Sequence, residues 1–407
     1  MGRSTGVPRA AGLIGSGGAS WRAAPNPTAS TDLRVEITRA PSPATLQAWD
    51  ALVAGTPGTD VNQLSAWARV RAVVGYAAGY VFAYDGNRLV GGAQVLQRRF
   101  RFGAILAYVP GGPVVAADVV DRAAVVAVLA DALSRLVGPR RALFVQPPDG
   151  GDDVSAALAA HGFRPSEAGI TPDGSLRLDL TRTEDELRAG LGRRLRYWTH
   201  KWAERGVTVR HGGPADVGLL AELMQHSARH QGYDALPCEY VEAFYRELAP
   251  GGHAVIFVGE VNGRPVAADL LTGSGGVLKG RLGGFDRTGD ASKLSVPAAV
   301  RWEAIRWAKR EGYRWFDFGG IDAGMLRDLL AGVEDGEGWP SADRSKLSFG
   351  GSPYAYPPKT ERIDSRAARL AYDAARRSRM GRRAIGAAEQ RLRGARPEGE
   401  AGAEPPR

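Results

Sequence analysis

The sequence predicts an α/β (α+β) fold built from two tandem units, each with a mixed, mostly antiparallel sheet flanked by helices. Three observations support this prediction. Glycine-rich breaks divide residues 254–285 into three apolar runs, and a helical repeat followed by an aromatic strand comes next. A weaker copy of the same pattern lies upstream, which indicates one kind of domain used twice.

The downstream unit carries the clearer signals. Asn262-Gly263 and 273–276 supply the positive φ angles that tight hairpins need, so we expect three antiparallel strands. Pro297 begins a helical repeat that ends before Gly312, a typical C-terminal glycine. An aromatic strand over 313–318 then breaks at two glycines, and sheets of this kind often bind ligands at such strand ends.

The upstream unit repeats this order. Strands are expected at 80–84, 88–96 and 105–109, a helix over 119–136 and a returning strand at 142–146. Arg88 precedes Arg264 by 176 residues and Phe144 precedes Phe316 by 172, a nearly constant offset. Residues 1–30 are rich in Gly, Ala, Ser and Pro without periodicity, so we expect a disordered leader.

Size and composition indicate a soluble globular protein. The 407 residues are 44% hydrophobic and 24% charged, which is enough to bury two ordinary cores. No stretch approaches the ~20 apolar residues of a membrane-spanning helix, and the N-terminus lacks the apolar core of a secretory signal. We therefore expect a cytoplasmic location.

Positive charge is concentrated in two segments that we expect to be helical. Eleven arginines and four acidic residues lie between Glu361 and Arg396. A second cluster follows a capping box, Thr183 with Glu186, and is predicted to continue as one helix to about Gly206. Its candidate RNA- or phosphate-binding residues are Arg193, Arg194, Arg196 and Lys201. Such helices suit nucleic-acid phosphates or anionic lipid headgroups, and a solvated face is the alternative.

Familiar catalytic and metal motifs are missing from the sequence. No phosphate-binding loop or dinucleotide fingerprint follows a predicted strand. His226 and His230 are spaced to share a metal, but a third ligand with suitable spacing is missing, so we predict no metal site. Cys238 is the single cysteine, which excludes an internal disulfide.

Two charged residues near the glycine break are candidates for chemistry. Asp317 closes the aromatic strand and is either an acid/base group or a structural cap. Lys346 precedes a Phe-Gly-Gly turn, where a fixed positive charge is suited to stabilising a developing oxyanion. From its spacing alone, a surface lysine is the preferred interpretation of Lys346.

Several segments in fixed order resemble the FemABX family over about residues 33–360. They are Trp67-Ala68-Arg69-Val70-Arg71, Glu204-Arg205-Gly206-Val207, Phe316-Asp317-Phe318-Gly319-Gly320-Ile321 and Ser345-Lys346-Leu347-Ser348-Phe349-Gly350. The resemblance implies two GNAT-like domains, at 31–174 completed by 352–378 and at 175–351, followed by a basic helical and disordered tail at 379–407. Members of the family transfer an amino acid from aminoacyl-tRNA to an amine on the stem peptide of a peptidoglycan precursor.

The resemblance also assigns roles to particular residues. Lys346 matches the lysine thought to stabilise the tetrahedral intermediate, while Arg71 and Tyr240 match positions that contact the precursor. Two departures stand out: Leu236 replaces an expected arginine, and Arg281 replaces an expected aromatic residue. We expect Arg281 to restore part of the lost positive charge and to bind substrate together with Gly319 and Gly320.

The resemblance implies no cofactor, because an aminoacyl ester is already activated for attack by an amine. The expected partners are aminoacyl-tRNA as co-substrate, a lipid-linked or nucleotide-linked precursor, and an anionic membrane surface at the inner leaflet for the basic tail. Three alternatives remain: a tRNA-dependent enzyme of secondary metabolism, an acyl-CoA-dependent GNAT N-acyltransferase, and a non-catalytic protein that binds nucleic acid or membrane.

Overall fold

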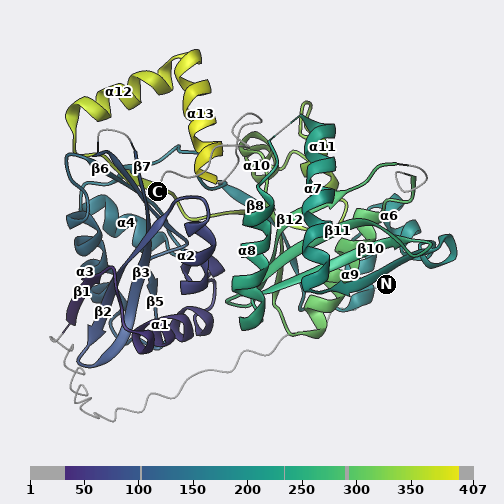
Figure 1. Cartoon of the computed structure of the whole chain (residues 1–407), viewed down its shortest axis with the longest axis horizontal. Coiled ribbons are helices and arrows are strands. Elements are labelled where there is room, and N and C mark those ends of the chain that lie inside the picture. The colour runs from purple at the N-terminus through teal and green to yellow at the C-terminus, as the bar shows by residue number, and fades with distance from the viewer. Residues whose placement is uncertain (1–32, 101–102, 233, 289–292, 394–407) are drawn as a thin grey trace, which may run out of the picture.

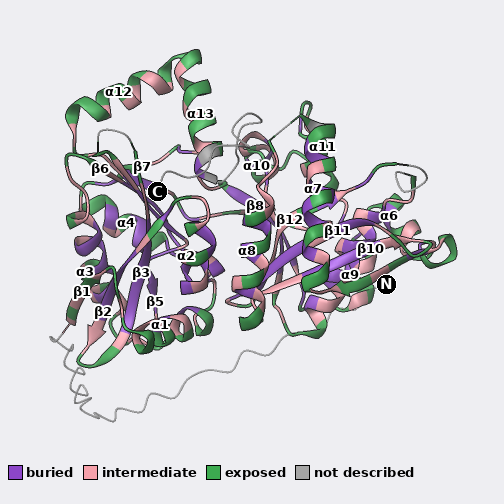
Figure 2. Ribbon diagram, in the orientation of Figure 1, coloured by how far each residue is buried: buried purple, intermediate pink, exposed green. Residues whose placement is uncertain are grey.

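The computed structural model describes residues 33–100, 103–232, 234–288 and 293–393, so the expected leader at 1–30 lies outside the described residues. Two mixed sheets lie side by side, each flanked by helices (Figure 1). Buried residues follow the strands and the helix faces that cover them (Figure 2). The predicted fold class is confirmed.

The N-terminal unit contains an eight-stranded sheet. In spatial order its strands are β1 (Leu33–Thr38), β2 (Ala77–Asp85), β3 (Arg88–Arg99), β4 (Ile105–Pro110), β6 (Arg141–Gln146), β15 (Thr360–Arg362) and β7 (Arg164–Pro165), with β5 (Val114–Val115) paired to β3. Its helices are α1 (Pro43–Gly55), η1 (Val61–Gln63), α2 (Ser65–Ala72), α3 (Arg122–Arg135) and α4 (Asp152–Ala160). The strands β4 and β6, which flank α3 in sequence, pair in parallel.

The second unit contains a seven-stranded sheet. In spatial order its strands are β14 (Ser352–Ala355), β8 (Gly174–Asp179), β13 (Trp315–Gly320), β12 (Val277–Phe285), β11 (Arg264–Ser274), β10 (Ala254–Val261) and β9 (Val207–Gly212). Its helices are α5 (Glu184–Ala189), α6 (Arg193–Thr199), η3 (Ala203–Arg205), η4 (Pro214–Asp216), α7 (Val217–Gln231), α8 (Cys238–Leu248), η5 (Ala249–Gly251), α9 (Val296–Arg310), α10 (Ala323–Leu330) and α11 (Ser341–Leu347). Here β12 and β13, which flank α9, are the parallel pair, so both units follow the predicted order of meander, helix and returning strand.

The chain returns to the first unit later than expected. The sequence places this return at residue 352, but β14 at Ser352–Ala355 pairs with β8 of the second sheet. Only β15 at Thr360–Arg362 joins the first sheet, between β6 and β7. Because β14 satisfies the backbone groups of β8 that face away from β13, the second sheet is complete only after Ala355.

The expected basic helix from Thr183 to Gly206 is broken into α5, α6 and η3. Its predicted capping box is present: Thr183 Oγ1 accepts from the Glu186 amide, and the Glu186 carboxylate accepts from the Thr183 amide. The break contains Gly190 and Gly192, which disfavour helix. The Gly192 amide donates instead to the Ser348 carbonyl at 2.7 Å, which ties the break to the segment around Lys346.

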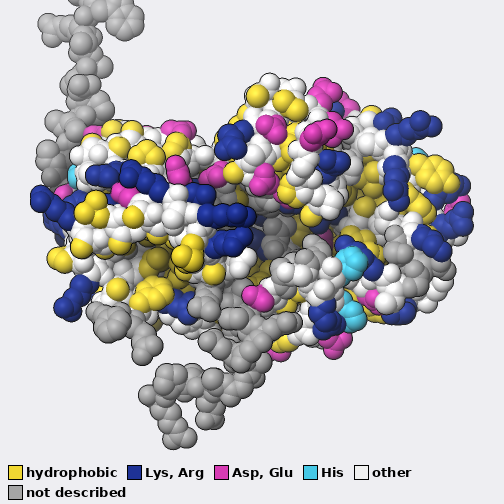
Figure 3. All heavy atoms as spheres, turned by 90° about the horizontal axis from the view of Figure 1, so that it is seen from above, with side chains coloured by type: hydrophobic (Ala, Val, Ile, Leu, Met, Phe, Trp, Pro, Cys, Tyr) yellow, Lys and Arg dark blue, Asp and Glu magenta, His cyan; other side chains and the backbone are white. Residues whose placement is uncertain are grey.

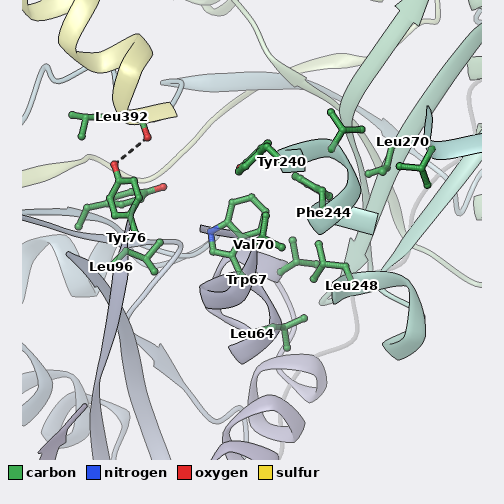
Figure 4. Packing of buried hydrophobic residues seen from close by; sticks show 14 of the residues in the cluster. Leu64, Trp67, Val70, Tyr76, Leu96, Tyr240, Phe244, Leu248, Leu270 and Leu392 are labelled. Carbon is green, nitrogen blue, oxygen red and sulfur yellow. Dashed lines mark hydrogen bonds between the residues drawn. The ribbon is translucent and has the colours of Figure 1, made fainter. Parts of the chain in front are cut away.

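A hydrophobic core joins the two units where α2 meets α8. The rings of Trp67 and Phe244 meet edge to face with centroids 5.2 Å apart. Figure 4 shows Trp67 and Val70 facing Phe244 and Leu248. Since Val70 and Leu248 are fully buried, this contact fixes α2 against α8 and so places the surfaces of the two units that face each other.

The C-terminal arm consists of α12 (Arg366–Arg377) and α13 (Arg379–Arg393). Figure 1 shows α12 along the outer end of the first unit and α13 turning back toward the junction of the units. Within the described residues, no helix combines the length and the apolar character needed to cross a bilayer.

Candidate active site

A cavity of about 910 Å³ lies between the two units. Its wall includes all five residues that the sequence assigned to substrate binding: Arg71, Tyr240, Arg281, Gly319 and Gly320. Arg71 comes from α2 of the first unit, and the other four come from α8, β12 and the end of β13. The fold therefore brings these predicted residues to one site, at the strand end where the glycine break was expected to bind a ligand.

Arg71 and Tyr240 meet at the first unit's side of the cavity. Arg71 Nη1 donates to the Tyr240 hydroxyl at 3.0 Å, and its guanidinium lies 4.5 Å from the centre of the Tyr76 ring. Both side chains are buried. A guanidinium held against aromatic rings in this way is preorganised to bind an oxygen of a ligand.

Asp317 lies beneath the glycine break, fully buried and not in the cavity wall. Its carboxylate accepts from Arg177 Nε at 2.9 Å, the Tyr356 hydroxyl at 2.9 Å and the Gly319 amide at 2.8 Å, and from the Ser175 hydroxyl. Burial alone would raise the pKa of Asp317, but the positive charges of Lys279 and Arg177 and these hydrogen bonds lower it to about 2. Such a carboxylate is a poor proton acceptor, so the geometry supports a structural cap and not the acid/base role.

Lys346 lies on α11, behind the same break. Its Nζ donates to the Gly320 carbonyl at 2.7 Å and to Asp343 Oδ1 at 2.9 Å. The side chain is largely buried, and it reaches the cavity through Gly320 without lining the wall itself. An ammonium has three donors, so the two described bonds leave one donor for an oxygen at the strand end.

Lys279 is a cation of the cavity wall that the sequence reasoning missed. Its Nζ lies 3.6 Å from Asp60 Oδ2, 4.0 Å from Asp317 Oδ2 and 4.6 Å from the centre of the Tyr356 ring. Burial alone would lower the pKa of Lys279, but Asp317, Tyr356 and Asp60 raise it, so the ammonium stays charged. The available signal was its spacing two residues from Arg281 on a predicted strand, which puts both side chains on one face.

Two ion pairs join the units beside the cavity. Arg281 pairs with Asp60, and Arg177 Nη1 lies 2.6 Å from Asp149 Oδ2. Arg281 also donates from Nε to Thr272 Oγ1 at 2.8 Å. Because Asp60 and Asp149 belong to the first unit and both arginines belong to the second, these ion pairs hold the two walls of the cavity in place relative to each other.

The predicted RNA-binding residues lie away from the cavity wall. Arg193, Arg194 and Arg196 are exposed on α6, and Lys201 follows it in an ion pair with Glu204 at 2.7 Å. Figure 1 shows α6 on the side of the second unit that faces away from the first. Tyr197 on the same helix is 57% exposed, so this surface combines cationic groups with an aromatic ring.

The candidate metal and thiol residues are not assembled into a site. His226 and His230 are exposed on α7. Across the described part of the chain, no three His, Cys, Asp or Glu side chains are grouped to hold a metal ion. Cys238 is a free thiol at the start of α8, within 3.2 Å of the Gln225 amide nitrogen.

Comparison with known proteins agrees with this architecture. Residues 187–325 match the acetyltransferase (GNAT) domain family. The structure superposes on the crystal structure of FemX with a TM-score of 0.70 and 18% identity, covering 82% of this chain and 99% of FemX. It also resembles the structure of L-PGS from Bacillus licheniformis, with a TM-score of 0.53 and 14% identity over 89% of this chain and 100% of that one.

Curated relatives are named lipid II:glycine glycyltransferase. That of Staphylococcus saprophyticus is 27% identical over 236 residues, which is 55% of this chain and 56% of the relative. That of Staphylococcus aureus is 26% identical over 227 residues, which is 53% of each. These findings bear out the resemblance to the FemABX family. The chain spans about half the length of the curated relatives that it matches.

Proposed function

We propose that this protein is an aminoacyltransferase of the FemABX type. It transfers an amino acid from aminoacyl-tRNA to an amine of a peptidoglycan precursor and so forms an amide bond in cell-wall cross-bridge synthesis. The observation that carries the proposal is the cavity between the units. Arg71, Tyr240 and the glycine break line it, and Lys346 donates to the Gly320 carbonyl of that break. The names of the relatives favour a lipid-linked precursor over a nucleotide-linked one.

The proposed reaction is aminolysis of an ester. A neutral amine attacks the ester carbonyl, the new C–N bond forms, the C–O bond to the tRNA ribose breaks, and the amine proton goes to the ribose oxygen. An aminoacyl ester is already activated, so the protein has to align the two substrates and neutralise the developing oxyanion. We assign the oxyanion to Lys346 at Gly320, and we assign Lys279 to maintaining positive potential in the cavity. The reaction as written requires no cofactor beyond aminoacyl-tRNA.

We assign the tRNA body to the cationic surface of α6. Phosphates suit Arg193, Arg194 and Arg196, and an exposed ring such as Tyr197 can stack on an unpaired base. This surface is separate from the cavity, as it must be for a large donor whose acyl end alone enters the site.

We assign the C-terminal arm to an anionic membrane surface, where a lipid-linked acceptor is located. Seen from above, Lys and Arg side chains line the face where α12 and α13 lie (Figure 3). Leu370 and Met380 are 70% and 82% exposed among these arginines. A helix pair with exposed apolar and cationic side chains suits the interface of an anionic bilayer. Co-sedimentation with phosphatidylglycerol vesicles, but not with phosphatidylcholine vesicles, tests this assignment.

The decisive experiment for the donor offers the purified protein a charged tRNA pool with lipid-linked or nucleotide-linked precursor, with and without ribonuclease. The proposal predicts an amide product that requires intact tRNA. A product that persists after ribonuclease would instead indicate an acyl-CoA or a free amino acid as donor, as in the GNAT alternative. Product formed only with an acceptor other than either precursor would indicate secondary metabolism.

A further inference from the structure

The C-terminal end of α13 reaches into the cavity between the units. Gln390 and Leu392 are part of the cavity wall, and Leu392 is only 5% exposed although most of the arm is not buried. The arm is therefore anchored at its tip, inside the site that the two units form.

The tip of α13 accepts hydrogen bonds from Arg71 in the cavity wall and from the neighbouring Tyr76. The backbone carbonyl of Leu392 accepts from Arg71 Nη2. It also accepts from the Tyr76 hydroxyl at 3.0 Å (Figure 4). The same guanidinium donates from Nη1 to Tyr240 at 3.0 Å. Arg71 and Tyr76 thus converge on one position, and the last turn of a helix from the same chain fills it.

A second contact holds the tip. The Glu389 carboxylate accepts from the Gly169 amide at 2.7 Å. Gly169 belongs to the first unit and forms part of the cavity wall. The two units therefore hold the last turn of α13 through the Leu392 carbonyl, the Glu389 carboxylate and the buried Leu392 side chain.

The chemistry of this position makes it a subsite for an anion. Carbonyls in the last turn of a helix carry partial negative charge, so a guanidinium binds them as it binds an anionic oxygen. A phosphoryl oxygen carries more charge, and its hydrogen bonds from the same donors are shorter and stronger. A ligand oxyanion and the Leu392 carbonyl cannot occupy the position together.

We propose that the last turn of α13 is an internal competitor for the phosphoryl group of the acceptor. The helix must leave Arg71 before the acceptor binds, so the apparent affinity for the acceptor is reduced by the fraction of molecules in which the tip is bound. Ser378, which is extended between α12 and α13, provides the point about which α13 turns. The inference deepens the proposed function because the anion is assigned to the acceptor, but its test requires no transfer and so fails or succeeds separately.

The test compares inorganic pyrophosphate binding to the full-length wild type and to the double variant Glu389→Ala/Leu392→Ala by titration calorimetry. The variant removes both side-chain anchors and leaves Arg71, Tyr76 and Tyr240 in place. We expect pyrophosphate to bind about fivefold more tightly, or better, because the competing closed state is depopulated. The matched control, Glu337→Ala/Leu330→Ala, alters exposed side chains outside the arm and the cavity wall and should bind as the wild type does. Equal or weaker binding to the anchor variant would overturn the proposal.

Hydrogen exchange of the wild type gives a second measurement that does not depend on that variant. Pyrophosphate should accelerate amide exchange at 389–393, because the ligand displaces the tip. Slower or unchanged exchange there is the result expected of a purely structural helix end and would overturn the proposal. Arg71→Met should abolish the effect of pyrophosphate, and a persisting effect would place the anion elsewhere and equally overturn it.

Two further ligands, titrated into the wild type and into Glu389→Ala/Leu392→Ala, distinguish the possible sources of the phosphoryl group. Tighter binding of a nucleoside diphosphate indicates a nucleotide-linked acceptor, and tighter binding of farnesyl diphosphate indicates a lipid-linked one. If neither ligand gains affinity over the wild type, the competitor role is contradicted.

Discussion

Replacing Asp317 by Asn separates a structural role from a chemical one. The substitution keeps the size of the side chain but removes the negative charge that faces Arg177 at 2.9 Å and Lys279 at 4.0 Å. Asp317 is completely buried, so water cannot replace the lost charge. The two cations would then lack their shared counter-charge at the base of the cavity.

The size of the effect follows from burial. Removing one partner of a buried ion pair costs about 3–5 kcal/mol of folding free energy. The lowered pKa of Asp317 agrees with this range, because a value of about 2 against the ordinary 3.8 corresponds to roughly 2.5 kcal/mol at neutral pH. We therefore expect Asp317→Asn to lower the free energy of unfolding by about 3 kcal/mol.

The assay is urea unfolding at pH 7, followed by tryptophan fluorescence and circular dichroism. Asp131→Asn is the matched control, because Asp131 pairs with Arg135 on the surface of α3 and should change stability by less than about 0.5 kcal/mol. A loss below about 1 kcal/mol for Asp317→Asn would refute the structural reasoning. If transfer were abolished as well, Asp317 would belong to the chemistry.

The lowered pKa of Asp317 makes the stability of the folded protein depend on pH in acid. The folded-state pKa of Asp317 is depressed, so its contribution is present above the unfolded pKa near 3.8 and is lost as pH falls toward about 2. Wild type should therefore lose stability relative to Asp317→Asn between about pH 4 and pH 2. Parallel acid-unfolding curves would contradict the assigned pKa.

Three further outcomes follow from the site and its supports. Lys279→Met should reduce transfer by about tenfold or more while tRNA binding persists, and unchanged turnover would remove this cation from the site. Arg193→Glu/Arg194→Glu should weaken tRNA binding and flatten its salt dependence in filter-binding assays, without changing pyrophosphate binding in the cavity. Thr183→Ala removes the capping box and should lower the free energy of unfolding by about 1 kcal/mol with transfer intact, and a loss of transfer would link α5 to the site.

The parts of the fold that the sequence predicted are those with strong local causes. Asn262 and Gly263 both have positive φ, at 51° and 78°, as the predicted hairpin turn requires. Gly312, with φ 80°, ends α9 where the sequence placed it. The gathering of Arg71, Tyr240, Arg281 and the glycine break in one cavity came from the family resemblance, because nothing local relates α2 to α8.

The features that the sequence reasoning missed depend on contacts between distant segments. Lys279 lies beside Asp317 through the register of β12 on β13, and beside Asp60, which is 219 residues earlier in the chain. The contact of Arg71 with Leu392 spans 321 residues, so no periodicity reveals it. The break in the basic helix did have a local signal at Gly190 and Gly192, which the arginine pattern outweighed.

Single-turnover transfer from purified aminoacyl-tRNA to a lipid-linked precursor, compared between wild type and Lys346→Ala, decides whether this lysine takes part in the chemistry. Lys309→Ala is the matched control, since Lys309 lies on α9 and binds the Leu180 carbonyl outside the cavity. We expect a loss of about 100-fold or more for Lys346→Ala with tRNA affinity unchanged, and wild-type rates for the control. Wild-type transfer by a folded Lys346→Ala protein would contradict the claim that this lysine stabilises the oxyanion at the glycine break.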